Sequence, residues 1–247
     1  MSMPEVAQVP VEQLPFNPED YSLKEILKPQ HSALLVIDMQ NDFLSPKGFF
    51  ATHPDSVGGG TIEQMQATVP HIQDLISTAR QAHVPVIFTK GYEDVKFRTG
   101  PGFRRAVKWQ ETDGDGSVNS QSGTWGAELY EGIEPQEGDI VVEKHKWSAF
   151  DGKDKDGKTL DEILKEKGIQ TLVLAGVVTE TCVHSTAQEA FNKDYFVVVP
   201  KDSVGSNKPD QHRTVLDRFD FLGDAIEAAE EIKQCWPSVE ETPSTSK

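Results

Sequence analysis

Short apolar runs and amphipathic stretches alternate along the middle of this chain. Five apolar runs have the length and continuity of strands that are buried on both faces, and they span residues 33–37, 85–88, 139–142, 170–175 and 195–199. Apolar residues recur at helical spacing over residues 61–83, 159–167, 179–193, 210–219 and 223–232. Strands that alternate with helices predict an α/β fold, in which a parallel sheet is covered by helices on both faces.

The two ends of one predicted helix can be placed from single residues. Thr159 is a typical N-cap residue, and Glu162 stands three positions later, as in a capping box. Gly168 supplies the usual C-terminal stop. In parallel sheets of this kind, ligands bind outside the carboxyl ends of the strands. The residues that directly follow each predicted strand are therefore the first candidates for function.

The 247 residues fit one α/β domain, expected over residues 31–236, with additions. Residues 1–30 are rich in Pro and Glu and predict a surface arm with a helical turn at Ser22–Leu27. Residues 237–247 predict a flexible polar tail. Residues 91–138 are too long for a plain connection. We expect this insertion to form a lid, a subunit contact, or both.

Composition and charge exclude several classes of protein. With 24 Lys and Arg against 40 Asp and Glu, the net charge is −16, so neither nucleic acid nor an anionic membrane surface is expected as a partner. No apolar run approaches the roughly 20 residues that span a bilayer, and the first residues lack the pattern of a secretory signal. Two cysteines, Cys182 and Cys235, exclude a disulfide scaffold and a four-cysteine zinc site. A reducing, cytoplasmic setting is therefore expected.

Three reactive side chains follow three of the predicted strands. Asp38 ends the first strand, Lys144 ends the third, and Cys182 follows the fourth at the start of a helix. Because parallel strands end at one edge of the sheet, these side chains should meet there. The start of a helix and the Lys144 ammonium would both favour the thiolate form of Cys182. The Asp38 carboxylate could accept the proton of the thiol. The backbone N–H groups of the first helical turn could bind an oxyanion. Each residue alone also has an ordinary explanation, as a turn cap, a solvated lysine or a small core side chain.

The sequence around these residues resembles the isochorismatase-like cysteine hydrolase superfamily. The resemblance covers about residues 30–235 and rests on the segments Leu34–Phe43, Val141–Phe150 and Gly176–Val183, followed by Thr186 and Ala187. It implies a three-layer α/β/α sandwich around a mostly parallel six-stranded sheet, which is a Rossmann-like arrangement. Oligomers are common in this superfamily, so a homo-oligomer is expected.

The resemblance also implies roles for individual residues. Asp38, Lys144 and Cys182 match the catalytic triad of the family, in which the cysteine attacks an amide carbonyl, an amine or ammonia leaves, and the thioester is hydrolysed. A cis peptide bond is implied at Val177–Val178. It would turn the backbone N–H of Val178 toward the oxyanion, beside the backbone N–H of Cys182.

Departures from the family pattern narrow the substrate. Nicotinamidases of this superfamily carry an Asp-x-His metal motif after the second strand, whereas Thr89–Val95 holds no histidine, so we expect no metal and no other cofactor. Cys182 favours a covalent amidase over an isochorismatase-type hydrolase, which cleaves a vinyl ether to a dihydroxybenzoate and pyruvate. The insertion and the arm are similar to those of enzymes that act on ureido, carbamoyl or biuret-like compounds. A non-catalytic binding protein of the same fold is a further alternative, which the intact trio disfavours.

Four more residues are candidates for contacting a small amide substrate: Gln40, Phe43, Trp147 and Glu180. Phe43 matches a pocket position of the family, and Trp147 could stack on a planar amide. Gln40 could bind the amide or satisfy backbone groups, and Glu180 could face the pocket or cap the helix. The insertion also holds three arginines, Arg98, Arg104 and Arg105. They could pair with a substrate carboxylate or lie on a solvated loop surface. Cys235 matches no motif and is expected to be a bystander.

Overall fold

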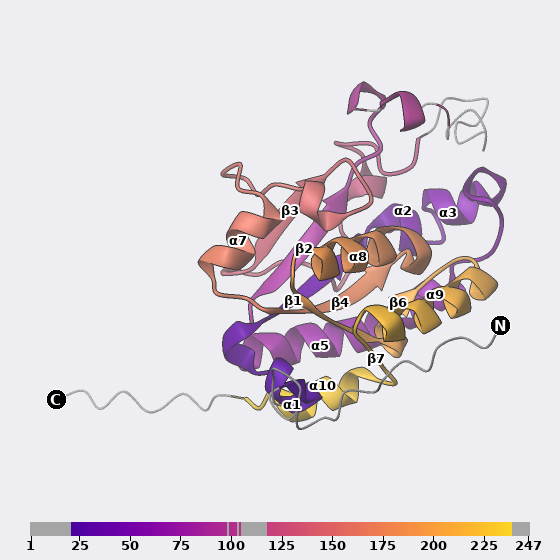
Figure 1. Ribbon diagram of the computed structural model, residues 1–247. Coiled ribbons are helices and arrows are strands. Elements are labelled where there is room, and N and C mark those ends of the chain that lie inside the picture. Colours follow the sequence, from indigo (N-terminus) through magenta and orange to yellow (C-terminus); the bar gives the residue numbers. More distant parts are fainter. Residues whose placement is uncertain (1–20, 98, 103, 105–117, 239–247) are drawn as a thin grey trace, which may run out of the picture.

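A parallel sheet forms the centre of the computed structural model, which describes residues 21–97, 99–102, 104 and 118–238 (Figure 1). Its strands run in the order β3-β2-β1-β4-β5-β7, and the short β6 pairs with β4. The strands are β1 (Ser32–Ile37), β2 (Val86–Gly91), β3 (Ile140–Lys144), β4 (Thr171–Val177), β5 (Phe196–Pro200), β6 (Val204–Gly205) and β7 (Asp224–Ile226). The five predicted strands are confirmed, each within about two residues of its expected start.

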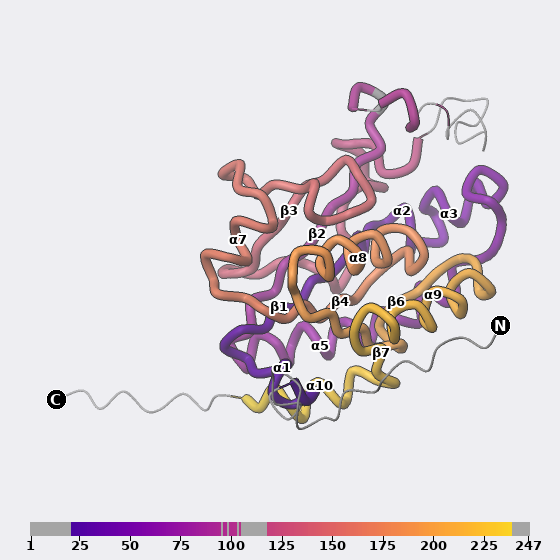
Figure 2. The backbone as a smooth tube through the Cα atoms, viewed as in Figure 1, coloured from indigo at the N-terminus to yellow at the C-terminus, as the bar shows by residue number. Residues whose placement is uncertain are grey.

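Helices cover both faces of this sheet, which confirms the three-layer sandwich (Figures 1 and 2). One layer holds α1 (Leu23–Ile26), α4 (Glu63–Ala67), α5 (Val69–Gln81) and α10 (Ala229–Cys235). The other layer holds α7 (Leu160–Glu166), α8 (His184–Asn192) and α9 (Pro209–Leu222). No helix of the described residues is long and apolar enough to cross a membrane.

Strand β1 shows how the core divides between the two layers. All six of its residues are buried. Leu34 and Val36 pack into the core beneath α5, whereas Leu35 and Ile37 pack into the core beneath α7 and α8. Successive side chains of a strand point to opposite faces, so a continuous apolar run supplies both cores at once.

Two predicted helices differ in the structure. The stretch 61–83 breaks at Thr68 into α4 and α5, and Pro70 lies in the first turn of α5, where its missing N–H is tolerated. The stretch 223–232 is not one helix, because its first part forms β7 at the sheet edge beside β5 and only Ala229–Cys235 is helical. The capping box of Thr159 and Glu162 is present at the start of α7.

The described part of the N-terminal arm, residues 21–30, packs into the domain and does not lie only on its surface. Ile26 and Leu27 are buried in the α5 layer. The indole N–H of Trp236 donates a hydrogen bond to the carbonyl of Leu27, so the arm and the end of α10 hold each other. The turn predicted at Ser22–Leu27 is confirmed as α1. Residues 1–20 of the arm and 239–247 of the tail lie outside the described residues.

The segment after β1 holds the described parts of the insertion in place. The Asn41 side chain donates to the carbonyl of Trp125. One oxygen of the Asp42 carboxylate accepts from the backbone N–H of Ser120 at 2.7 Å, and the other accepts from Phe49 at 3.0 Å. The part of the insertion around Ser120 and Trp125 therefore meets the segment that follows the carboxyl end of β1, where the site was expected.

We predict that Gly176→Ala will lower the free energy of unfolding by about 2–5 kcal/mol, because a positive φ costs about 1–2 kcal/mol and overpacking about 1–3 kcal/mol. Gly176 has a φ of 124°, and an added β-carbon would lie 2.1 Å from the carbonyl oxygen of Ile37. The matched control is Gly157→Ala, because Gly157 also has a positive φ but an added β-carbon would meet nothing within 4 Å. Urea unfolding should show only about 1–2 kcal/mol for the control. Equal losses in the two variants would contradict the assigned clash.

Candidate active site

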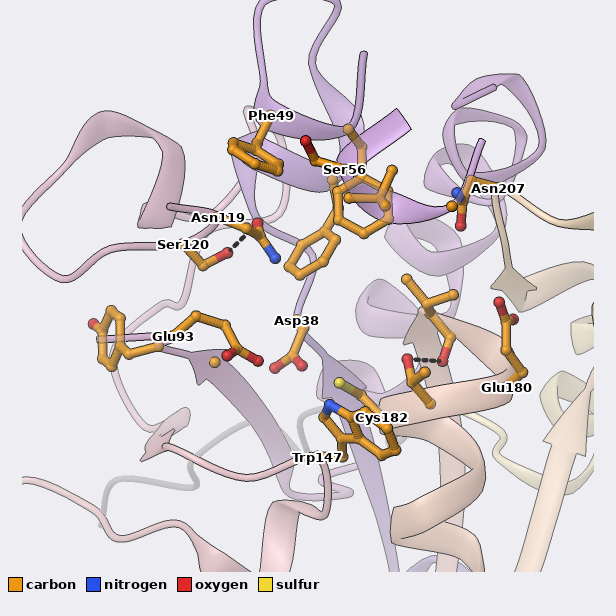
Figure 3. Close-up of a pocket in the computed structure, with 18 of the residues that line it drawn as sticks. Asp38, Phe49, Ser56, Glu93, Asn119, Ser120, Trp147, Glu180, Cys182 and Asn207 are labelled. Carbon is orange, nitrogen blue, oxygen red and sulfur yellow. Dashed lines mark hydrogen bonds between the residues drawn. The ribbon is translucent and has the colours of Figure 1, made fainter. Parts of the chain in front are cut away.

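A cavity of about 300 Å³ lies at the carboxyl edge of the sheet, and the three predicted reactive side chains line it (Figure 3). Asp38 follows β1, Lys144 ends β3, and Cys182 follows β4. Aromatic side chains form much of the remaining wall, namely Phe43, Phe49, Phe50, Tyr92 and Trp147. The structure therefore brings together residues that are far apart in the sequence, as the strand-end rule predicted.

Asp38 and Lys144 form a buried ion pair in the cavity wall. The Lys144 ammonium lies 2.7 Å from a carboxylate oxygen of Asp38, and each side chain is 1% exposed. The hydroxyl of Thr89 donates to the other carboxylate oxygen at 2.6 Å. The ammonium also donates to the carbonyl of Lys146 at 3.0 Å. Both charges thus have hydrogen-bond partners besides each other, which buried charges require.

Backbone geometry allows this pair to close. Asp38 has a φ of 50°, in the left-handed region that Asp tolerates better than most residues. Gly91 ends β2 beside the pair, and an added β-carbon there would lie 3.1 Å from a carboxylate oxygen of Asp38 and 3.3 Å from the ammonium of Lys144. A larger residue at Gly91 would therefore crowd both charges.

Cys182 lies in the π-helical turn Thr179–Val183, between β4 and α8. Its side chain is largely buried, and its backbone carbonyl accepts a hydrogen bond from the hydroxyl of Thr186 at 2.7 Å. Thr186 in turn accepts from the backbone N–H of Ala149 at 3.0 Å. The start of α8 is thereby tied to the segment after β3, which carries Lys144.

Burial raises the pKa of the Cys182 thiol to about 12. The Lys144 ammonium acts in the opposite direction, while the carboxylates of Asp38 and Glu93 raise the pKa further, and the thiol is hydrogen-bonded to Asp38. The expected resting thiolate is therefore wrong, because burial and the two carboxylates outweigh one ammonium. Burial by itself lowers the pKa of Lys144, but Asp38 and Cys182 raise it to a net value well above its usual range, so this lysine stays charged.

Val178, the predicted oxyanion residue, also lines the cavity. The peptide bond Val177–Val178 is cis. The carbonyl of Val178 accepts hydrogen bonds from the N–H groups of Thr181 and Val183, which draw the turn around Cys182 together.

Three of the four predicted substrate contacts line the cavity: Phe43, Trp147 and Glu180. The ring of Phe43 packs on Phe50 with centroids 4.8 Å apart, and Trp147 is 40% exposed at the cavity wall. One carboxylate oxygen of Glu180 is buried and has no hydrogen-bond partner among the described residues. These positions suit a small, flat ligand that lies against aromatic rings.

Gln40 is not a wall residue of the cavity, and its predicted substrate contact is corrected. Its side chain is fully buried. The amide nitrogen donates to the carbonyls of Gly91 at 3.0 Å and Ala127 at 2.9 Å, and the amide oxygen accepts from the Gly91 N–H at 2.9 Å. All of these partners are backbone groups, so Gln40 positions the end of β2 next to the ion pair.

Sequence reasoning missed several polar residues of the cavity: Glu93, Asn119, Ser120, Asn207 and Lys208. Glu93 stands two residues after β2, so the strand-end rule could have found it. Asn207 and Lys208 follow β6, whose two residues leave no periodic signal. Arg104 is exposed, and Arg98 and Arg105 lie outside the described residues.

Cys235 is a free, partly buried thiol at the end of α10 and is not among the residues that line the cavity. Among the described residues, no group of three or more His, Cys, Asp or Glu side chains is arranged to hold a metal ion.

A parallel α/β sandwich with an acid–ammonium–thiol cluster at its carboxyl edge defines a class of hydrolytic enzyme. The chain belongs to the isochorismatase family, whose domain model, described as Isochorismatase domain, matches residues 32–230. It is 30% identical to ureidoacrylate amidohydrolase RutB of Agrobacterium fabrum, over 85% of this chain and 90% of that protein.

Solved structures share the fold. N-carbamoylsarcosine amidase from Thermoplasma acidophilum is 25% identical with a TM-score of 0.59, over 85% of this chain and 99% of that one. A cysteine hydrolase from Pseudomonas syringae pv. phaseolicola has a TM-score of 0.68 at 22% identity, over 84% of this chain and 93% of that one. The second likeness is one of fold alone.

We predict that Cys182 will react slowly with iodoacetamide near neutral pH, roughly a thousandfold more slowly than free cysteine, because only the thiolate reacts. Its pKa is raised, so the thiol form persists until the pH approaches about 12. The rate should rise about tenfold per pH unit from pH 8 to pH 11. Alkylation is measured in a Cys235→Ala background, where the label reports Cys182 alone. A rate that levels off between pH 7 and pH 9 would show a depressed pKa and contradict the assignment.

A second prediction concerns the buried amide of Gln40. Gln40→Leu keeps the size of the side chain but leaves backbone groups of Gly91 and Ala127 without partners. We expect the free energy of unfolding to fall by about 2–5 kcal/mol, because each unsatisfied buried group costs about 1–3 kcal/mol. Trp147→Leu is the control, since this exposed side chain contacts the cavity and should alter stability by less than about 1 kcal/mol. Urea unfolding that ranks the variants in the opposite order would contradict the structural role.

Proposed function

We propose that this enzyme hydrolyses the C–N bond of a small linear amide, ureide or carbamoyl compound through a covalent thioester on Cys182. The observation that carries the proposal is the hydrogen-bonded thiol, carboxylate and ammonium in the wall of one cavity. The proposal is supported by the names of two similar proteins, ureidoacrylate amidohydrolase and N-carbamoylsarcosine amidase, which both describe hydrolysis of such a C–N bond.

In the first step, the sulfur of Cys182 forms a bond to the carbonyl carbon of the substrate. The thiol is protonated at rest, so its proton passes along the existing hydrogen bond to Asp38 as the sulfur attacks. The carbonyl oxygen becomes an oxyanion, which accepts hydrogen bonds from the backbone N–H groups of Val178 and Cys182. Lys144 stabilises the negative charge of Asp38 before the transfer and holds the carboxyl in place after it.

The intermediate collapses when the C–N bond breaks. Asp38 returns the proton to the leaving nitrogen, which departs as ammonia or an amine and leaves a thioester on Cys182. A water molecule then attacks the thioester while Asp38 takes one of its protons. The carbon–sulfur bond breaks, the proton returns to sulfur, and the acid product leaves. One carboxyl thus acts alternately as base and acid, which balances the protons over the cycle.

The cellular location and the oligomeric state that the sequence predicts are also part of this proposal. We propose that the enzyme works in the cytoplasm, and the free thiols of Cys182 and Cys235 fit a reducing compartment. We also propose a homo-oligomer. Exposed aromatic side chains on the surface support it, because such residues are enriched in interfaces: Trp125, Phe191 and Phe221.

Ammonia release from a panel of ureides, carbamoyl acids, biuret and aliphatic amides tests the proposed reaction. We predict that Cys182→Ala will lower kcat/KM by at least about a thousandfold, because the nucleophile is removed. Asp38→Asn should lose a similar factor, since the amide cannot accept the thiol proton.

Cys235→Ala is the matched control, because it removes the other thiol and should retain activity. Circular dichroism confirms that each variant is folded. Retention of activity in Cys182→Ala would overturn the covalent mechanism, and pyruvate release from isochorismate by that variant would support vinyl-ether hydrolysis. Ligand binding without turnover of any panel member would indicate a non-catalytic protein.

A further inference from the structure

We propose that Lys208 binds a carboxylate at the far end of the substrate, so that the enzyme prefers anionic amides or ureides. This inference rests on the proposed function, because it concerns the same cavity. Lys208 directly precedes α9 and is one of the residues that line the cavity.

The ammonium of Lys208 has no counter-ion among the described residues, although the chain carries a net charge of −16. No ion pair or side-chain hydrogen bond joins it to any of them. The other two lysines of the cavity differ: Lys144 is paired with Asp38, and Lys146 is exposed and supplies its carbonyl to Lys144. In so acidic a protein, a partly buried ammonium that lines the cavity and forms an ion pair with none of the cavity carboxylates is an available site for an anion.

The backbone that carries Lys208 is held firmly at the cavity wall. The side chain of Asn207 is buried and donates to the carbonyl of Gly59 at 2.6 Å. The backbone N–H of Lys208 donates to the hydroxyl of Ser206 at 2.9 Å. The side-chain nitrogen of Lys208 lies over Gly58, because a β-carbon added to Gly58 would be 2.6 Å from it. A glycine with a positive φ therefore makes room for the ammonium at this place.

The cavity then has two chemically different ends around the reacting thiol. Figure 3 shows Glu93 and Asn207 on opposite sides of the cavity, with Asp38 and Cys182 between them. The Glu93 carboxylate is near enough to raise the pKa of Cys182, and it suits the N–H groups of an amide or ureide. A substrate with its amide at the thiol and a carboxylate several bonds away would place that charge on the side of Lys208.

The test compares two ureides that differ only at the far end, where β-ureidopropionate has a carboxylate and N-propylurea has a methyl group. Ammonia release is measured for the full-length enzyme and for Lys208→Met, Lys208→Arg and Lys155→Met. We expect the unaltered enzyme to favour β-ureidopropionate by about 10- to 100-fold in kcat/KM, as a charge-assisted contact provides. In Lys208→Met this preference should fall close to one, mainly through a higher KM for the anion, and Lys208→Arg should restore part of it.

Lys155→Met is the matched control, because it removes the same charge from an exposed lysine remote from the cavity wall, and it should keep the full preference. Equal turnover of the two ureides by the unaltered enzyme would overturn the inference and leave the proposed function standing. A preference that survives Lys208→Met would also overturn it. Turnover of neither ureide would instead count against ureide hydrolysis itself, and the inference would fail with it.

Discussion

The buried ion pair of Asp38 and Lys144 is the interaction on which the site depends. The sheet order β3-β2-β1 places β2 between the strands that carry the two residues. The pair must therefore close across the end of β2, where Gly91 is the Cα partner of Lys144 in the sheet register. Removing two charges from water is costly, and only close geometry with further hydrogen bonds compensates for it. The absence of a side chain at Gly91 and the hydroxyl of Thr89 supply those conditions from the same strand.

This pair also explains why the thiol is not ionised at rest. A lone ammonium beside Cys182 would favour the thiolate, and the sequence suggested that outcome because Lys144 and a helix start were the visible features. In the folded protein the ammonium is already matched by the Asp38 carboxylate, while the thiol is buried and hydrogen-bonded to that carboxylate. In the proposed reaction, activation of the sulfur therefore depends on a proton acceptor in contact with it and on a substrate that supplies the developing oxyanion.

Regular features could be predicted from the sequence, and irregular ones could not. The apolar runs that supply both cores identified five strands, and the strand-end rule then brought Asp38, Lys144 and Cys182 together. The role of the Gln40 side chain could not be decided from the sequence, because its position after β1 is compatible with either a contact to a ligand or hydrogen bonds to the backbone. Only the folded chain shows that Gly91 and Ala127 use its amide completely. No sequence pattern indicated that Lys208 lies at the cavity, because the two-residue strand β6 that precedes it is too short to show the hydrophobic pattern of a strand.

The few residues after β1 connect the chemistry of the site to its walls. Asp38 belongs to the carboxylate, ammonium and thiol cluster, and Gln40 fixes the end of β2. Asp42 accepts hydrogen bonds both from Ser120 in the insertion and from Phe49 in the aromatic wall. The sheet sets where the thiol, carboxylate and ammonium meet, while the loops held by this segment set which molecule fits above them. A change at Asp42 would therefore alter substrate fit without touching a reacting atom, whereas a change at Gln40 would disturb Gly91 and with it the ion pair. Reaction type and substrate choice are thus separable in this fold, although a single short segment supports both.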